Sequence, residues 1–186
     1  MEEGPDARGR RTFWALVVGV VVLDVITKWL AVRYLVPQHR PHDVIGEWVR
    51  LTLVYNRGAA FGLHLGPYSR WIFLILSIGA LYILSRLYRT TRPRDWIRLA
   101  SLGLVCGGAV GNLIDRIRHG MGVVDFLDIG IGDMRWPTFN VADIAVSTGA
   151  FLLAWALWGE DSAEARKGAK EPDPRRVPSA KPSQGS

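Results

Sequence analysis

Four apolar stretches, each close to the length that crosses a bilayer, constrain this chain more than any other feature. They cover residues 13–35, 71–87, 96–114 and 140–158. A membrane-spanning helix needs about 20 mostly apolar residues, because the hydrocarbon offers no water to backbone amides and carbonyls. The chain has 186 residues, of which 49% are hydrophobic. We therefore predict an all-α membrane protein with four transmembrane helices.

The two ends of the chain differ from the apolar stretches. Residues 1–11 and 160–186 are polar, charged or rich in Pro, Ser and Lys. Such segments bury too little apolar surface to offset the entropy lost on ordering. We expect disordered tails on both sides of a single membrane domain, residues 12–159. Cys106 is the only cysteine, which excludes an intramolecular disulfide and a cysteine-cluster metal site.

The distribution of cations predicts the orientation in the membrane. Short loops rich in Arg and Lys stay on the cytoplasmic side. The connection between the second and third stretches is crowded with cations: Arg86, Arg89, Arg92, Arg94 and Arg98. The arginines of residues 8–11 and the Arg and Lys residues of the C-terminal tail agree with this side. We expect both termini in the cytoplasm, and the connections 36–70 and 115–139 outside it.

The outward connections carry a strand pattern. Apolar and polar residues alternate from Val49 to Leu53, which is typical of a half-buried strand, and Asn56-Arg57-Gly58 favours a turn. Residues 123–131 are rich in β-prone side chains. We predict that these segments pair in a small extracytoplasmic sheet.

A row of glycines marks the third stretch. Gly103, Gly107 and Gly111 are spaced by four, so they share one face of a helix. Rows of small residues let membrane helices approach closely. We expect another helix to pack against this row.

Charged residues inside spans are costly and often functional. Asp24 and Lys28 are four apart, so they either neutralise each other or line the wall of a site. We interpret Asp115 as half of a structural pair with Arg116. Arg116 and Asn112 also offer a cation and an amide to a polar group that enters the bundle.

Asp125 and Asp143 are expected at one depth near the outer surface. Asp125 follows the β-prone Val123-Val124, and Asp143 lies three residues after Asn140 at the start of the fourth span. Asn140 and Asp143 also resemble a helix capping box, which leaves Asp125 unexplained. Two carboxylates in a low-dielectric site share a proton, so that one acts as base and the other as acid. Such a pair activates water against an amide.

Other chemistries fit less well. No His-Glu-x-x-His pattern for zinc is present, and Cys106 lies deep in an apolar helix. The rival interpretation is a small transporter or lipid-binding bundle with structural charges. A charge path should then cross the membrane, but residues 71–85 contain no charge. A scaffold with purely structural charges is a third interpretation.

Five motifs in register resemble the lipoprotein signal peptidases, also called type II signal peptidases. They are Asp24-x-x-Thr27-Lys28, Asn56-Arg57-Gly58-Ala59-Ala60-Phe61-Gly62, Gly107-Gly108-Ala109-x-Gly111-Asn112-x-x-Asp115-Arg116, Val123-Val124-Asp125-Phe126 and Phe139-Asn140-x-Ala142-Asp143. Their order and approximate spacing match over nearly the whole chain apart from the tails.

The resemblance implies an aspartic endopeptidase that cleaves diacylglyceryl prolipoproteins on the amino side of the lipidated cysteine. It implies Asp125 and Asp143 as the catalytic pair. The implied substrate-binding and supporting residues are Asn56, Arg57, Asn112, Arg116, Asn140, Asp115, Asp24 and Lys28. It implies no metal and no other cofactor. The implied fold adds a small extracytoplasmic sheet that cradles the substrate and a short amphipathic segment in the first outward loop.

The resemblance also implies the setting of the enzyme. We expect a multi-pass protein of the bacterial cytoplasmic (inner) membrane, with its site near the extracytoplasmic face. Its expected partners are the prolipoprotein substrate, membrane lipids and inhibitors of the globomycin type. We expect a monomer that binds no nucleic acid.

Overall fold

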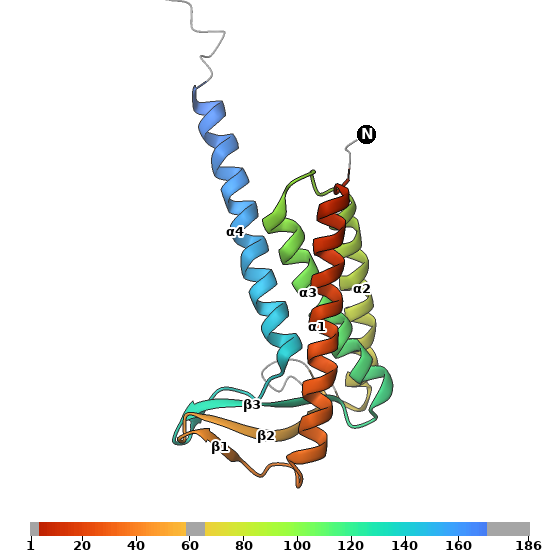
Figure 1. Ribbon diagram of the computed structural model, residues 1–186, viewed down its shortest axis with the longest axis vertical. Coiled ribbons are helices and arrows are strands. Elements are labelled where there is room, and N and C mark those ends of the chain that lie inside the picture. Colours follow the sequence, from red (N-terminus) through yellow and green to blue (C-terminus); the bar gives the residue numbers. More distant parts are fainter. Residues whose placement is uncertain (1–3, 59–65, 171–186) are drawn as a thin grey trace, which may run out of the picture.

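A computed structural model describes residues 4–58 and 66–170 of the chain. Four long helices stand side by side, and a small sheet lies across one end of them (Figure 1). The helices are α1 (Ala7–Tyr34), α2 (Ser69–Arg89), α3 (Trp96–Arg118) and α4 (Val141–Lys170). The strands are β1 (His42–Ile45), β2 (Val49–Asn56), β3 (Val123–Ile131) and β4 (Met134–Arg135), and a 3-10 turn, η2 (Gly66–Tyr68), precedes α2.

The predicted transmembrane helices are confirmed by length and composition. Each helix contains a stretch long and apolar enough to cross a membrane. Large apolar side chains on their outer surfaces are exposed in the protein alone, including Trp14, Ile75, Ile83 and Phe151. A helix surface of this kind suits lipid contact, because hydrocarbon requires no polar group there.

The helices at both ends of the chain extend into the segments expected as tails. Helix α1 begins at Ala7, where the Asp6 side chain caps it by accepting a 2.7 Å bond from the Gly9 amide. Helix α4 continues to Lys170 instead of ending near residue 160. Residues 160–170 are mostly good helix formers without proline, so the apolar span propagates through them. The rest of the expected tail, residues 171–186, lies outside the described residues.

Helix α3 is the centre of the bundle. It packs against α1, α2 and α4. A Cβ atom at Gly107 would lie 2.8 Å from the Val20 Cβ of α1, and one at Gly103 would lie 3.1 Å from the Leu16 Cβ. The glycine row therefore permits the close approach of α1 that the sequence predicts.

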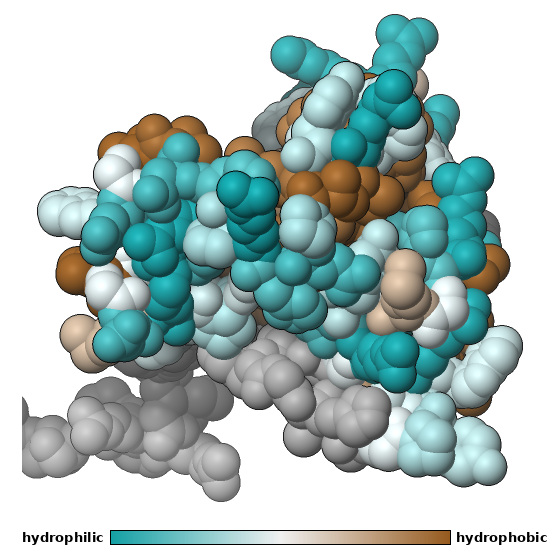
Figure 2. Space-filling view, turned by 90° about the horizontal axis from the view of Figure 1, so that it is seen from below, coloured by the Kyte–Doolittle hydropathy of each residue, from teal (hydrophilic) through white to brown (hydrophobic). Residues whose placement is uncertain are grey.

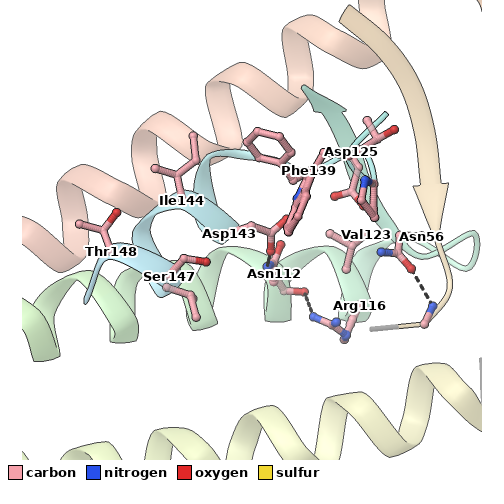
Figure 3. Close-up of a pocket in the computed structure, with 15 residues that line it drawn as sticks. Asn56, Asn112, Arg116, Val123, Asp125, Phe139, Asp143, Ile144, Ser147 and Thr148 are labelled. Atoms are coloured by element: carbon pink, nitrogen blue, oxygen red, sulfur yellow. Dashed lines mark hydrogen bonds between the residues drawn. The ribbon is translucent and has the colours of Figure 1, made fainter. Parts of the chain in front are cut away.

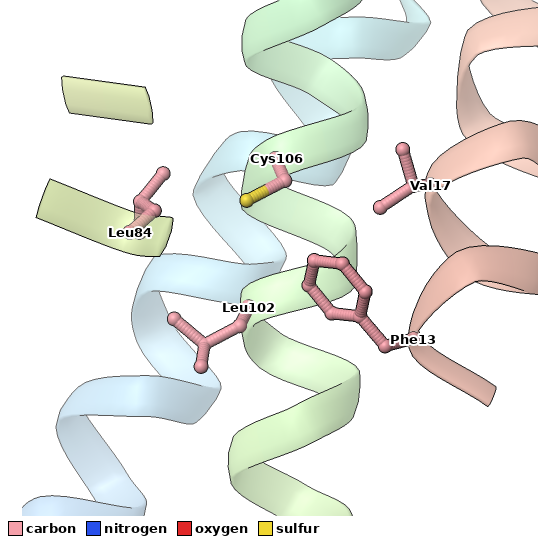
Figure 4. Packing of buried hydrophobic residues seen from close by; sticks show 5 residues of the cluster. All are labelled: Phe13, Val17, Leu84, Leu102 and Cys106. Carbon is pink, nitrogen blue, oxygen red and sulfur yellow. The ribbon is translucent and has the colours of Figure 1, made fainter. Parts of the chain in front are cut away.

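The half of the bundle away from the sheet is held by a compact apolar cluster. Phe13 and Val17 of α1, Leu84 of α2, and Leu102 and Cys106 of α3 are buried together (Figure 4). Cys106 thus packs as a small apolar side chain, as its position in the sequence indicates.

The sheet confirms the two predicted strands and adds two short ones. Its order is β1-β2-β3-β4 with antiparallel pairing throughout. In the β2–β3 register, Val54 faces Asp125. A second apolar cluster includes Ala31 of α1 and Leu35, the residue that follows α1, with Leu53 and Val124 of the sheet. It fixes the sheet to the end of α1.

The sheet end differs in polarity from the helical walls. Viewed from the sheet end, the surface carries mainly hydrophilic residues with hydrophobic ones among and behind them (Figure 2). The start of α1, the α2–α3 connection and the end of α4 lie at the opposite end (Figure 1). The described part of the first outward connection forms β1, β2 and η2. Residues 59–65, which belong to the loop expected to hold the amphipathic segment, lie outside the described residues.

Candidate active site

A cavity of about 510 Å³ lies where α3, the start of α4 and the sheet meet. Asp125 and Asp143 both line it, although they come from different elements (Figure 3). Asn56 from the end of β2, and Asn112 and Arg116 from α3, also line it. Five of the residues expected at the site are therefore gathered around one space.

Asp125 is placed by the register of the sheet. Its side chain is almost fully buried, and its Oδ1 atom accepts a 2.7 Å hydrogen bond from Asn140 Nδ2. Burial, aided by the negative charge of Asp143, raises the pKa of Asp125 from 3.8 to about 7 against the opposing hydrogen bonds from Asn56 and Asn140. Asp125 therefore keeps its proton to an unusually high pH.

Asp143 and Asn140 form a reciprocal capping box at the start of α4. The Asp143 amide donates to Asn140 Oδ1 over 2.9 Å, and the Asn140 amide donates to Asp143 Oδ2 over 3.1 Å. The expected helix cap is thus present, yet the same carboxylate also lines the cavity. Structural and catalytic interpretations of Asp143 are compatible, because the cap fixes the position of the carboxylate.

The side chain of Asn140 connects the two aspartates. It is fully buried, donates a hydrogen bond to the Asp125 carboxyl group and accepts one from the backbone amide of Asp143. Its Nδ2 also donates to Asn112 Oδ1 over 3.1 Å. One amide therefore fixes Asp125 and Asp143 relative to each other and to α3.

Asn112 is oriented from behind by Lys28. Its Oδ1 accepts a 2.9 Å bond from Lys28 Nζ, which leaves its Nδ2 to donate to Asp143 Oδ1, also over 2.9 Å. Asn112 therefore holds one oxygen of the Asp143 carboxylate at the cavity.

Arg116 and Arg57 take different places. Arg116 lines the cavity, and its Nη1 atom donates to the Asn112 carbonyl over 3.1 Å (Figure 3). Arg57 is exposed and lines a separate cavity of about 290 Å³ that also includes Arg70. Arg57 is therefore not among the residues that line the cavity of the two aspartates.

Asp24, Lys28 and Asp115 form a buried ionic cluster behind the cavity. Lys28 Nζ lies 2.7 Å from Asp24 Oδ2 and 2.9 Å from Asp115 Oδ2. Asp24 also accepts from the Ala142 amide, and Asp115 from the Val124 amide. The expected Asp24–Lys28 pair is present. The expected pairing of Asp115 with Arg116 is wrong, because Asp115 faces α1 while Arg116 faces the cavity.

Several residues that line the cavity carry no signal in the sequence motifs. They are Trp136, Pro137 and Thr138 before α4, and Ile144, Val146, Ser147 and Thr148 along α4. For the first group, the sequence offered one signal of a binding site, a tryptophan in a polar loop. The residues of α4 cannot be told from ordinary membrane-span residues in the sequence. Across residues 4–58 and 66–170, no group of three His, Cys, Asp or Glu side chains is placed to hold a metal ion.

Comparisons with known proteins show which family the chain resembles. The model of the signal peptidase (SPase) II family matches residues 16–159. The lipoprotein signal peptidase of Pelotomaculum thermopropionicum is 42% identical over 159 residues, which cover 85% of this chain and 99% of the relative. That of Nitratidesulfovibrio vulgaris is 40% identical over 164 residues, with 87% and 96% covered.

Solved structures show the same fold. A bacterial membrane enzyme determined by the in meso method at 2.3 Å resolution superposes with a TM-score of 0.75 at 28% identity, covering 88% of this chain and 95% of the other. A second such structure, at 1.9 Å, gives a TM-score of 0.70 at 30% identity, with 84% and 97% covered. The chain therefore belongs to the signal peptidase II family, the aspartic membrane proteases that remove signal peptides from lipoproteins.

Proposed function

We propose that Asp125 and Asp143 are the catalytic pair, and that the protein cleaves diacylglyceryl prolipoproteins on the amino side of the lipidated cysteine. The observation that supports this most is the joint placement of the two carboxylates. They come from β3 and α4, line one cavity and are linked through Asn140. The negative charge of Asp143 also acts on Asp125, as expected of two carboxylates that work as a pair.

The surroundings of the two side chains support different roles for them. Asp125, with its pKa raised to about 7 by burial, is the proton donor. Asp143, whose carboxylate is held by hydrogen bonds from Asn112 Nδ2 and the Asn140 amide and lines the same cavity, is the base. Arg116 and Asn56, which line the same cavity, hold the polar backbone of the substrate.

The reaction then proceeds in two proton-balanced steps. Asp143 takes a proton from water while the water oxygen bonds to the scissile carbonyl carbon, and Asp125 gives its proton to the carbonyl oxygen. When the carbon–nitrogen bond breaks, Asp143 returns its proton to the leaving nitrogen. A hydroxyl of the intermediate gives its proton back to Asp125, so a carboxylic acid and an amine leave and the pair is restored.

We propose that the cavity lies near the extracytoplasmic face of the bacterial inner membrane. The arginine-rich α2–α3 connection, the start of α1 and the end of α4 lie at the end opposite the sheet (Figure 1). Cation-rich short loops remain cytoplasmic, which places the sheet outside. A lipid-anchored substrate then reaches the cavity by lateral diffusion in the membrane. We assign the peptidase domain to residues 12–159.

We propose further that the enzyme works as a monomer and binds inhibitors of the globomycin type. The cavity is lined by side chains of one chain, so a single copy supplies both aspartates and the three asparagines around them. A peptide antibiotic of this type would occupy the same cavity as the substrate peptide, because both polar and apolar side chains line it.

The purified protein in detergent should release the signal peptide from a diacylglyceryl prolipoprotein. Mass spectrometry of the products should place the cut immediately before the lipidated cysteine, and globomycin should suppress it. The matched control is the same precursor without the diacylglyceryl group, which should remain uncut. Cleavage at another bond, or equal cleavage of both precursors, would contradict the proposed specificity.

The rate of cleavage should fall as the pH rises above neutrality. The pKa of Asp125 is raised from 3.8 to about 7, so the proton donor is present below pH 7 and lost above it. Well above this pH, kcat/KM should fall by about tenfold for each pH unit. The same raised pKa makes the fold less stable as pH rises through 7, so initial rates must be normalised to folded protein. A rate that is flat from pH 6 to about 9 would remove Asp125 as the donor.

A further inference from the structure

The cavity has one wall that the catalytic scheme does not use. Trp136, Pro137, Thr138 and Phe139 line it in succession between β4 and Asn140. The Trp136 side chain is 59% exposed. A large aromatic surface at the mouth of a peptide-binding cavity is well placed to contact substrate.

One ion pair fixes the start of this wall. Arg135, the residue before Trp136, places its Nε atom 2.6 Å from Asp128 Oδ1 and donates from Nη2 to the Asp128 carbonyl over 3.0 Å. Its Nη1 donates to the Glu47 carbonyl over 2.9 Å. Asp128 is buried, and its other oxygen accepts from the Thr52 hydroxyl over 3.0 Å. A single guanidinium thereby ties β4 to β3 and to the β1–β2 turn.

Backbone bonds fix the two ends of the wall. The Trp136 amide donates to the Ile129 carbonyl over 2.8 Å. Phe139 and Leu127 exchange bonds of 3.0 and 2.8 Å. The segment between them depends on the Arg135–Asp128 pair for its orientation at one end and on the start of α4 at the other.

The cavity also has a direction. Val146, Ser147 and Thr148 line it along α4, which runs into the membrane, whereas the wall lies beside the sheet. A signal peptide crosses the membrane, so the residues before the cleaved bond follow α4. The residues after it must leave past the sheet.

Resting on the proposed function, we propose that Arg135 and Asp128 are positioning residues that hold the wall 136–139, and that this wall binds the lipoprotein residues after the lipidated cysteine. The wall therefore contributes to substrate affinity and not to the chemical step. Its contribution depends on how far the substrate extends beyond the cleaved bond.

The test uses two lipidated peptides with the same signal sequence. One ends in an amide at the diacylglyceryl cysteine, and the other continues for several residues beyond it. Trp136→Ala and Arg135→Gln should raise KM for the extended peptide by about tenfold, with kcat unchanged. KM for the truncated peptide should stay at the wild-type value, because that peptide does not reach the wall.

Arg50→Gln is the matched control. Arg50 has the same side-chain exposure as Arg135 and stands opposite Asp128 in the β2–β3 pairing, but its 2.8 Å ion pair is with Asp43 on the far side from the wall strand β4. It should leave both KM values unchanged. An equal rise of KM for both peptides, or no rise for the extended one, would overturn the proposal. Trp136→Ala keeps the test valid if Arg135→Gln lowers folding, since the indole is largely exposed. A wild-type protein that cleaves neither peptide would instead reject the proposed function.

Discussion

Replacing either aspartate by asparagine, as Asp125→Asn or Asp143→Asn, should reduce prolipoprotein cleavage by about a hundredfold to ten-thousandfold. Asparagine has nearly the same shape as aspartate, but its amide neither donates nor accepts a proton at the pH of the assay. The Asp125 variant lacks the donor, and the Asp143 variant lacks the base. Initial rates from a gel-shift assay of lipidated precursor, with equal amounts of folded protein, measure the effect.

The control for this result is Asp133→Asn. Asp133 lies in the turn between β3 and β4 and is exposed, so its replacement should leave the rate unchanged. The Asp143 variant also tests whether the capping box alone explains that residue. Asparagine retains an oxygen for the Asn140 amide, so a purely structural role predicts wild-type cleavage from folded protein. Such a result would remove Asp143 from the chemistry.

The sequence predicts the large elements well because their signals are local. Apolar length reveals the four helices, and the β-prone run 123–131 becomes β3 with the same bounds. The glycine row predicts a close neighbour because spacing by four defines one helix face. Helix ends were less predictable, since residues 160–170 carry charge but also high helix propensity.

Partners across the bundle were harder to predict. Periodicity places Asp115 and Arg116 near one face of α3 but does not say which neighbour each meets. The fold turns Asp115 toward Lys28 of α1 and Arg116 toward the cavity. Likewise, the link from Asn140 to Asp125 depends on the β2–β3 register beside α4, which no local pattern encodes.

The family assignment also decides between the rival functions. A transporter needs polar groups along a path through the bundle. Among the described residues, the buried charges of the spans gather instead at the sheet end as one cluster with Lys28 at its centre. These charges support a site at one surface.

Replacing Lys28 by methionine should destabilise the fold by about 3–5 kcal/mol, because breaking a buried ion pair leaves unpaired charge behind. Lys28 pairs with both Asp24 and Asp115, and all three side chains are buried. The two carboxylates also accept hydrogen bonds from backbone amides of α4 and β3. Loss of Lys28 should therefore weaken the packing of the helices against the sheet. The midpoint of thermal unfolding in detergent measures it.

A triple variant separates charge from packing. Asp24→Asn and Asp115→Asn, added to Lys28→Met, remove every formal charge of the cluster while keeping its volume and its carbonyl acceptors. Much of the lost stability should return, since the neutral side chains no longer need the ammonium. Activity should stay low, because Asn112 Oδ1 still lacks its hydrogen bond from Lys28. The hydrogen bond from Asn112 Nδ2 to Asp143 Oδ1 is weakened as a result. If the Lys28→Met protein has the same midpoint of thermal unfolding as the wild type, the ionic cluster does not stabilise the contact between the helices and the site.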